Sequence, residues 1–188
     1  MSIGHFIDVI VLTIFVSEVG LSIAKRAKVG HHLVNDDTSL RLIWRTIGIG
    51  ITASVLSKMF LPHPVFSGVF FEYGSAALLI SGMGLRWFSI IYLGREFTID
   101  VAIIEGHRLV TTGPYKLMRH PSYTGVLLIF LGMGVHFNHI VSLVSLSFPI
   151  FWVIRYRIGV EEKALESFFG IEYKQYQQRT KKLLPFLY

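Results

Sequence analysis

Long, nearly uninterrupted runs of apolar side chains are the feature that most constrains this sequence. Five such runs are present: Ile3–Ala24, Leu42–Leu61, Val65–Leu93, Ser122–Val135 and Ile140–Ile154. A helix needs about 20 apolar residues to cross the hydrocarbon core of a bilayer, where no water is present to hydrogen-bond an open backbone. The first three runs reach that length, and the last two fall short. We therefore expect an all-α, polytopic membrane helical bundle of about five transmembrane helices, in which the last two runs form a tight hairpin that either spans or re-enters.

The composition agrees with a membrane chain and limits its chemistry. Of the 188 residues, 52% are hydrophobic and 16% are charged, whereas soluble domains carry about 25% charged residues. This length leaves room for a single domain over residues 1–188, with three N-terminal spans in 1–93 and a polar loop, the hairpin and a C-terminal helix in 94–188. Cysteine is absent, which excludes disulfides, a thiolate nucleophile and cysteine metal ligands.

The positive charges are distributed asymmetrically. The net charge is +6, and all but two of the 18 Lys and Arg residues fall in residues 25–45, 94–121 and 155–188; the two others are Lys58 and Arg86. Because Lys and Arg accumulate in cytoplasmic loops, five spans place the N-terminus outside and both the polar loop and the C-terminus in the cytoplasm. Anionic headgroups account for a basic charge in these places, so no nucleic-acid partner is expected.

The chain beyond Arg157 has the pattern of an amphipathic helix. Apolar and aromatic residues recur there at three- and four-residue steps among charged ones: Leu165, Phe168, Phe169, Tyr173 and Tyr176. This spacing predicts a helix that lies at the cytoplasmic face of the membrane or packs on the polar loop. Gly170 is expected to break it into two pieces. The apolar end, residues 183–186, is predicted to dock onto the rest of the protein.

Two polar stretches on the predicted cytoplasmic side hold most of the chemically versatile side chains. One covers residues 105–123 and the other covers residues 155–162. Because the hairpin between them returns to the side from which it leaves, the two stretches are expected to lie beside each other. A loop rich in Gly, Pro, His, Tyr and Arg next to an Arg/Glu cluster indicates a pocket for a polar cofactor that meets a lipid-borne substrate.

Several short motifs follow one another in this half of the chain. In order they are His107-Arg-Leu-Val110, Gly113-Pro-Tyr115, Arg119-His-Pro-Ser-Tyr-Thr-Gly125, Arg157, Glu161-Glu162, Phe168-Phe-Gly170, Tyr173, Tyr176 and Leu184-Pro185. This ordered set resembles the isoprenylcysteine carboxyl methyltransferases and their prokaryotic relatives over about residues 93–186. The resemblance implies a membrane enzyme that transfers a methyl group from S-adenosyl-L-methionine to a lipid-like carboxylate or hydroxyl.

The resemblance also implies residue roles. The segments that enclose S-adenosylmethionine in the family match His107, Arg108, Leu109, Val110, Tyr115, His120, Pro121, Ser122 and Tyr123. Glu162 is implied at the same cofactor site and Arg157 is implied to face the substrate carboxylate, and we take both as the catalytic candidates. The chain departs from the family in two places: a glutamine that contacts the cofactor in eukaryotic members aligns near Asp100, and Gly159-Val160 thins the acidic run after Arg157.

Methyl transfer to a carboxylate is consistent with the chemistry of these residues. A carboxylate acceptor has a reference pKa of about 4, so it is ionised near pH 7 and needs no general base. Arg157 can hold it through a planar fork of N–H donors, and Glu162 suits an ammonium or ribose hydroxyl of the cofactor. The two residues lie five apart and do not share a helix face, which predicts separate partners, or a kink near Gly159, rather than a mutual salt bridge. A hydroxyl acceptor needs a base, for which His120 and Tyr123 are the first candidates.

Structural roles compete with these assignments. Arg119-His120-Pro121 is also typical of a helix start with a basic anchor, and Tyr115 and Tyr123 are also typical of aromatic anchors at the membrane interface. Arg155 and Glu161 are more typical of structural residues than of site residues.

Polar and small residues inside the apolar runs carry further expectations. Arg86 is costly in lipid and is expected to face the bundle or to snorkel. His136 and His139 have a spacing that metal ligands can use, but no carboxylate or cysteine lies near them in sequence, so no metal site is expected. Small residues of the third run are expected to let helices approach closely: Ala77, Ser81 and Gly82.

Two other functions remain open on the sequence alone. One is an NADPH-dependent membrane reductase of related fold. Nucleotide competition would identify it, because such a reductase would bind NADPH and not S-adenosylhomocysteine. A non-catalytic membrane scaffold or small-molecule carrier would tolerate replacement of the site residues but not of the helix faces. The expected partners are membrane lipids and a lipophilic small-molecule or lipidated substrate, such as an isoprenoid acid, a phenol or pyrone, or a phospholipid amine; the oligomeric state is not predicted.

Overall fold

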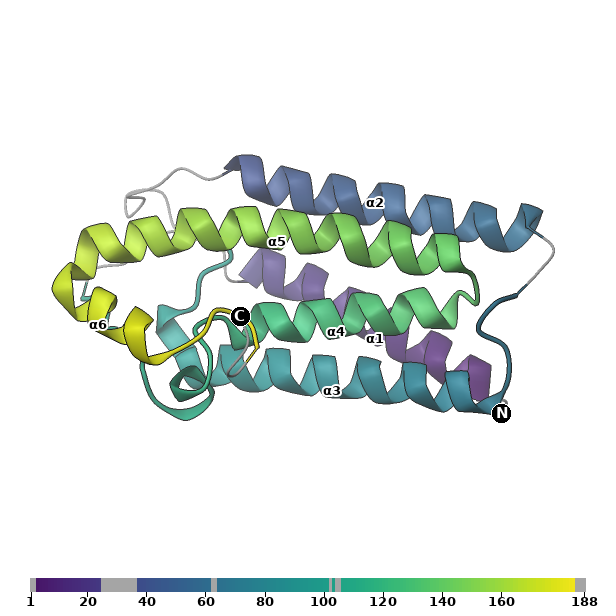
Figure 1. The fold of residues 1–188 in the computed structure, drawn as a ribbon, viewed down its shortest axis with the longest axis horizontal. Coiled ribbons are helices and arrows are strands. Elements are labelled where there is room, and N and C mark those ends of the chain that lie inside the picture. Colours follow the sequence, from purple (N-terminus) through teal and green to yellow (C-terminus); the bar gives the residue numbers. More distant parts are fainter. Residues whose placement is uncertain (1–2, 25–36, 62–63, 102, 104–105, 185–188) are drawn as a thin grey trace.

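The structure is a computed structural model that describes residues 3–24, 37–61, 64–101, 103 and 106–184 (Figure 1). In this part of the chain the regular elements are helices: α1 (Ile3–Ala24), α2 (Asp37–Phe60), α3 (Val69–Leu93), η1 (Gly94–Glu96), η2 (Gly113–Lys116), α4 (Pro121–His136), α5 (Ile140–Phe169) and α6 (Ile171–Arg179). The predicted all-α class is therefore confirmed. Parts of three predictions lie outside the described residues: the basic residues 25–28 of the first loop, Glu105 of the polar loop, and residues 185–186 of the C-terminal segment.

Helices α1 to α5 lie side by side along the long axis and alternate in direction (Figure 1). α4 packs between α3 and α5, α5 also packs against α2, and α1 packs on α3 and α4. The loop between α3 and α4, together with α6, gathers at the end of the bundle opposite the N-terminus (Figure 1). This arrangement brings the two predicted polar stretches to the same end of the molecule.

Helix length and surface character make this a multi-pass membrane protein. Among the described residues α1, α2, α3 and α5 are long and apolar enough to cross a bilayer. α4 has 16 residues, which at 1.5 Å per residue is about 24 Å, somewhat short of a hydrocarbon core of about 30 Å. Large apolar side chains such as Phe70, Ile23 and Ile91 are more than 70% exposed. That exposure is unfavourable in water and appropriate in lipid.

The helix boundaries correct the sequence-based expectation in three places. α5 is one continuous helix of 30 residues, whereas the sequence predicted a span ending at Ile154 and a separate helix after Arg157. The charged residues end the apolar run but not the helix, and Gly159 does not interrupt it; the break comes at Gly170, with φ of 58°, as predicted. α2 begins at Asp37 rather than at Leu42, and α3 begins at Val69 rather than at Val65 because Gly68 adopts φ of 103°.

Glycines allow α3 and α4 to cross at close range. A Cβ added at Gly125 would lie 2.6 Å from the carbonyl oxygen of Gly82 and 2.8 Å from the backbone nitrogen of Arg86. The expectation that Gly82 permits close helix contact is therefore confirmed. The same expectation was wrong for Ala77 and Ser81, whose side chains are exposed on the outer face of α3. The pattern of small residues did not reveal which face of the helix would meet α4.

Two polar pairs tie α1 to the bundle. Arg86 of α3 donates from Nε and Nη2 to the carboxylate of Glu18, the Nη2–Oε2 distance being 2.6 Å. Arg86 thus faces the bundle, as one of the two expectations stated, and its charge is compensated in lipid by a partner. His136 Nε2 lies 2.9 Å from Asp8 Oδ1. Among the described residues no group of three or more potential metal ligands occurs.

The α3–α4 crossing generates the first prediction. Replacing Gly125 with alanine brings a methyl group into steric clash with backbone atoms of α3. We therefore expect a destabilisation of about 1–3 kcal/mol, the usual cost of overpacking. The measurement is the midpoint of thermal unfolding in detergent. Gly84→Ala is the matched control, because a Cβ there meets no atom within 4 Å. Equal midpoints for the two variants would show that the helices do not cross here.

Candidate active site

The returning hairpin brings the two polar stretches into contact. The hydroxyl of Tyr123, in the first turn of α4, donates to Glu161 Oε2 of α5 at 2.8 Å. It accepts a hydrogen bond from Arg157 Nε, also at 2.8 Å. One tyrosine side chain therefore joins the histidine–proline motif to the Arg/Glu cluster. The geometric expectation on which the predicted site depended is confirmed.

A polar pocket lies at this junction. Its walls come from the segment after α3, the start of α4, the end of α5, and α6, and it encloses about 90 Å³. All of the predicted site residues line it except Pro121 and Glu162. The volume is below the roughly 300–1,000 Å³ of most ligand sites. A ligand the size of a nucleoside would therefore require some lining side chains to move outward.

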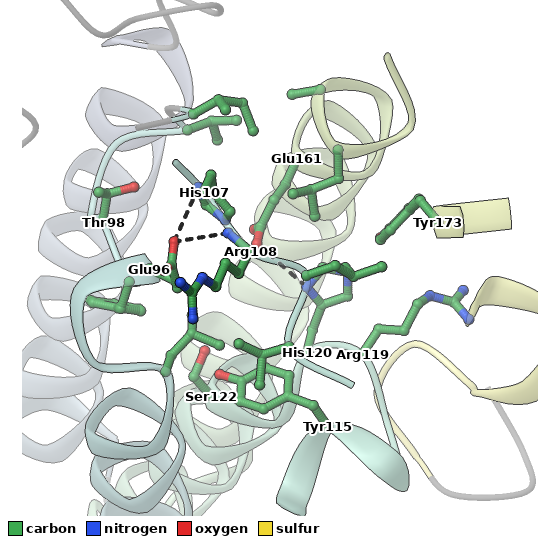
Figure 2. Close-up of a pocket in the computed structure, with 18 of the residues that line it drawn as sticks. Glu96, Thr98, His107, Arg108, Tyr115, Arg119, His120, Ser122, Glu161 and Tyr173 are labelled. Carbon is green, nitrogen blue, oxygen red and sulfur yellow. Dashed lines mark hydrogen bonds and ion pairs between the residues drawn. The ribbon is translucent and has the colours of Figure 1, made fainter. Parts of the chain in front are cut away.

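Glu96 anchors the loop that forms one wall of the pocket. Its carboxylate is 8% exposed and accepts hydrogen bonds from the backbone nitrogen of Arg108 at 3.3 Å and from Arg95 Nε at 2.9 Å. Figure 2 shows the carboxylate reaching toward both His107 and Arg108. Sequence reasoning assigned no role to Glu96. A carboxylate directly after a span, ahead of a polar loop, was the signal that could have identified it.

His107 is buried at the edge of the pocket without a hydrogen-bond partner for Nδ1 among the described residues. The nearest acidic atom, Glu96 Oε2, is 3.7 Å away, too far for a hydrogen bond. Burial lowers the pKa of His107, while the carboxylates of Glu96 and Glu161 oppose that shift. The ring stacks edge-on against Phe169, with centroids 5.7 Å apart. His107 is thus held by packing, with one nitrogen left for another partner.

Glu162 and its neighbour Glu161 occupy different places. Glu162 Oε1 accepts from Arg119 Nε at 2.8 Å and lies 3.4 Å from His120 Nε2, and its Oε2 lies 2.9 Å from Lys182 Nζ. This carboxylate does not line the pocket, whereas that of Glu161 does. The role of Glu162 at the cofactor site stays a prediction. Its contacts with Arg119 and Lys182 account for it as a structural anchor. Of these two adjacent glutamates, Glu161 is the one that a ligand in the pocket would meet.

The C-terminal segment is fastened to the histidine–proline motif. The backbone N–H of Arg119 donates to the carbonyl of Lys181 at 2.8 Å, and the hydroxyl of Thr124 donates to the carbonyl of Leu183 at 2.6 Å. Leu183 is 2% exposed and belongs to the core. The predicted docking of this segment is therefore confirmed for Leu183, whereas Leu184 is exposed. The chain end helps to hold the pocket wall in place.

A second, apolar cavity adjoins the polar pocket. It encloses about 370 Å³ between α1, α2, α4 and α5, and aliphatic and aromatic side chains form most of its wall. The two cavities share four lining residues: Phe97, Thr98, Tyr123 and Arg157. A hydrophobic space of this size that begins at the polar pocket is suited to an apolar chain whose polar end lies at the junction.

Arg157 is the charged residue of this junction. It is 4% exposed and donates from Nη1 to the hydroxyl of Ser39 on α2 at 2.6 Å, from Nε to Tyr123, and from Nη2 to the carbonyl of Ile99. Arg157 and Glu162 have different partners, as their spacing of five predicted. Ser39 was missed by sequence reasoning, because nothing local distinguishes a serine that meets an arginine 118 positions away.

The fold and the paired cavities define a multi-pass helical membrane protein with a polar site at one end of its bundle. The model of the isoprenylcysteine carboxyl methyltransferase (ICMT) family matches residues 75–167, which include the start of α4 and the Arg/Glu cluster. The chain is a distant relative of this family, as its motifs indicated. The matched region holds most of the polar pocket, including Arg157 and Tyr123.

Curated relatives carry the same family name. A probable protein-S-isoprenylcysteine O-methyltransferase of Oryza sativa subsp. indica is 35% identical over 120 residues, covering 63% of each chain. Protein-S-isoprenylcysteine O-methyltransferase B of Arabidopsis thaliana is 38% identical over 112 residues, covering 58% of this chain and 57% of the relative. The chain thus spans less than two thirds of the length of these relatives.

A solved structure has a similar fold. The eukaryotic intramembrane Ras methyltransferase ICMT superposes with a TM-score of 0.61 at 25% sequence identity, covering 82% of this chain and 55% of the solved one. The likeness therefore extends beyond residues 93–186, where the sequence motifs occur. At least part of the chain before residue 93 therefore belongs to the shared fold.

The depressed pKa of His107 generates a prediction of pH dependence. In the unfolded chain histidine takes up a proton near pH 6.5, whereas folded His107 does so only at lower pH because of its burial. The contribution of this pKa difference to the free energy of unfolding is therefore fully present above pH 6.5, and it is lost as the pH falls below that value. We expect the thermal midpoint to fall more steeply between pH 7.5 and pH 5 in the wild type than in His107→Gln. Parallel profiles would contradict the buried, neutral state of this histidine.

Proposed function

We propose that this protein transfers a methyl group from S-adenosylmethionine to the carboxylate of a lipophilic, isoprenylcysteine-like substrate at the membrane. The observation that carries the proposal is that Arg157 and Tyr123 line both the polar pocket and the apolar cavity. A substrate with an apolar chain in the larger cavity would present its polar end to the residues that face the cofactor. The names of the similar proteins support the same reaction.

The polar pocket has donor and acceptor groups that fit S-adenosylmethionine. Three buried side-chain atoms lack a hydrogen-bond partner among the described residues, and two of them, His107 Nδ1 and the hydroxyl of Tyr173, belong to residues that line this pocket. An unpaired buried polar group costs about 1–3 kcal/mol, so two in one pocket favour a ligand that hydrogen-bonds there. Glu161 adds a carboxylate for an ammonium or ribose hydroxyl, while Leu109 and Val110 add apolar surface for a base.

Different residues of the site have different roles in the proposed reaction. When bound, S-adenosylmethionine supplies a methyl group on a positively charged sulfur, which an acceptor oxygen displaces in line. Arg157 holds the acceptor carboxylate by charge, and Ser39 and Tyr123 fix the direction of its guanidinium. The apolar walls exclude water, and the alignment of acceptor and donor is the larger contribution expected of such a site.

The acceptor is a carboxylate rather than a hydroxyl in this proposal. A hydroxyl needs a base to remove its proton, and the two candidates for a base are already engaged: the Tyr123 hydroxyl donates to Glu161, and His120 lies against Glu162. A carboxylate needs no base at neutral pH. The positive charge of Arg157 at the junction also selects an anionic acceptor.

The site faces the cytoplasm in this proposal. The α3–α4 loop and α6, which contribute walls of the polar pocket, lie at the end of the bundle opposite the N-terminus (Figure 1), and the α3–α4 loop and the C-terminal segment carry basic residues. Lys and Arg in such positions favour the cytoplasmic side of a membrane. A lipidated substrate would then enter from the inner leaflet, with its tail in the apolar cavity and its carboxylate at the junction.

Equilibrium binding and turnover test the proposal. We expect detergent-purified protein to bind S-adenosylhomocysteine, with no competition from NADPH. Arg157→Ala should lower kcat/KM for a prenylcysteine acid about 100-fold, because truncating one side of a buried charged contact costs about 2–5 kcal/mol. Thermal unfolding verifies that each variant is folded.

Arg155→Ala is the matched control for this variant. It removes the same charge from the same helix at a residue that lies outside both cavities, where the guanidinium packs over Trp152 at 5.7 Å. Its kcat/KM should stay within about twofold of the wild type, as surface substitutions usually do. The proposed function would be refuted if the intact protein did not bind S-adenosylhomocysteine, or if it bound NADPH instead.

A further inference from the structure

The hydroxyl of Tyr173 is a buried polar group that the fold itself does not use. Tyr173 lies on α6, is 1% exposed and lines the polar pocket. Its hydroxyl oxygen has no hydrogen-bond partner within the described part of the chain. Figure 2 shows Tyr173 on the side of the pocket opposite Glu96 and Thr98. The sequence motifs included this tyrosine, but no role followed from them.

The neighbouring Tyr176 shows what a structural tyrosine does on the same helix. Its hydroxyl donates to the backbone carbonyl of Tyr115 at 2.6 Å, which ties α6 to the α3–α4 loop. The two rings contact each other edge-on, with centroids 6.0 Å apart. A phenylalanine at 173 could bury the same ring without leaving a hydroxyl unpaired. The hydroxyl of Tyr173 therefore needs a partner that folding alone does not supply.

The surroundings of Tyr173 limit what that partner can be. Burial and the nearby carboxylates of Glu162 and Glu161 raise the pKa of Tyr173 well above its ordinary value, so the hydroxyl stays protonated and can donate. These carboxylates outweigh the opposing charge of Arg119, so a further anionic group is disfavoured at this place. A neutral acceptor, such as a ring nitrogen or a ribose oxygen, meets both conditions.

We propose that Tyr173 is a binding residue for the nucleoside half of the methyl donor, to which its hydroxyl donates a hydrogen bond. This inference rests on the proposed function and makes α6 part of the cofactor site rather than only a cover over the loop. Because α6 follows the break at Gly170, it can approach the pocket at an angle that a straight continuation of α5 would not allow. The position of α6 then determines how well the nucleoside is held.

Tyr173→Phe, with Tyr176→Phe as its matched partner, tests the inference in the full chain. For Tyr173→Phe we expect the Kd for S-adenosylhomocysteine to rise about tenfold, while the thermal midpoint of the ligand-free protein is unchanged or higher. Tyr176→Phe should lower the ligand-free midpoint, because it removes a hydrogen bond that the fold uses. If Tyr173→Phe lowered the ligand-free midpoint as much as Tyr176→Phe does, the hydroxyl would be structural and the inference would be overturned.

A second ligand locates the contact within the donor. Methylthioadenosine lacks the amino-acid half, so the loss of affinity in Tyr173→Phe should persist with it at a similar size. A loss seen with S-adenosylhomocysteine but not with methylthioadenosine would place the contact on the amino-acid half and overturn the assignment. Equal affinities of wild type and Tyr173→Phe for both ligands would also overturn it. If the wild type bound neither ligand, the proposed function itself would fail.

Discussion

A guanidinium buried where several segments meet is the constraint on which the rest of the structure depends. Arg157 of α5 donates hydrogen bonds to Ser39 of α2, to Tyr123 of α4 and to the backbone at Ile99. A buried charge is tolerated only when such partners surround it, so the arginine fixes the positions of these segments relative to one another. The same charge lies on the boundary between the two cavities. Packing and the proposed substrate recognition therefore share one anchor.

The two cavities adjoin each other and differ in polarity. The polar pocket collects carboxylates, guanidiniums, histidines and tyrosines near the membrane surface, whereas the apolar cavity continues between the helices. α1 closes one side of the apolar cavity and is tied to α3 and α4 by the pairs Glu18–Arg86 and Asp8–His136. Methyl transfer to a membrane-borne carboxylate needs such an arrangement, because the donor is water-soluble and the acceptor is not.

The sequence predicted what depends on local pattern, and it missed what depends on distant contacts. Apolar periodicity identified the helices and the break at Gly170, and the ordered motifs placed the pocket at the histidine–proline loop. The continuity of α5 escaped prediction because charged residues end an apolar run without ending a helix. Glu96 was missed as a pocket residue, and so was Ser39, which reaches Arg157 only through the folded arrangement. Glu161 rather than Glu162 lines the pocket, a difference of one helical step that depends on how α5 is rotated.

The most direct test of this account is the chemical nature of the transferred methyl group. Purified protein in lipid would be given methyl-labelled S-adenosylmethionine with N-acetyl-S-farnesylcysteine or with the corresponding carboxamide. We expect that the acid is labelled, that mild alkali releases the label as methanol because the product is an ester, and that the carboxamide stays unlabelled. A label that resists alkali, or a protein that binds S-adenosylhomocysteine but labels neither compound, would contradict transfer to a carboxylate at the Arg157 junction.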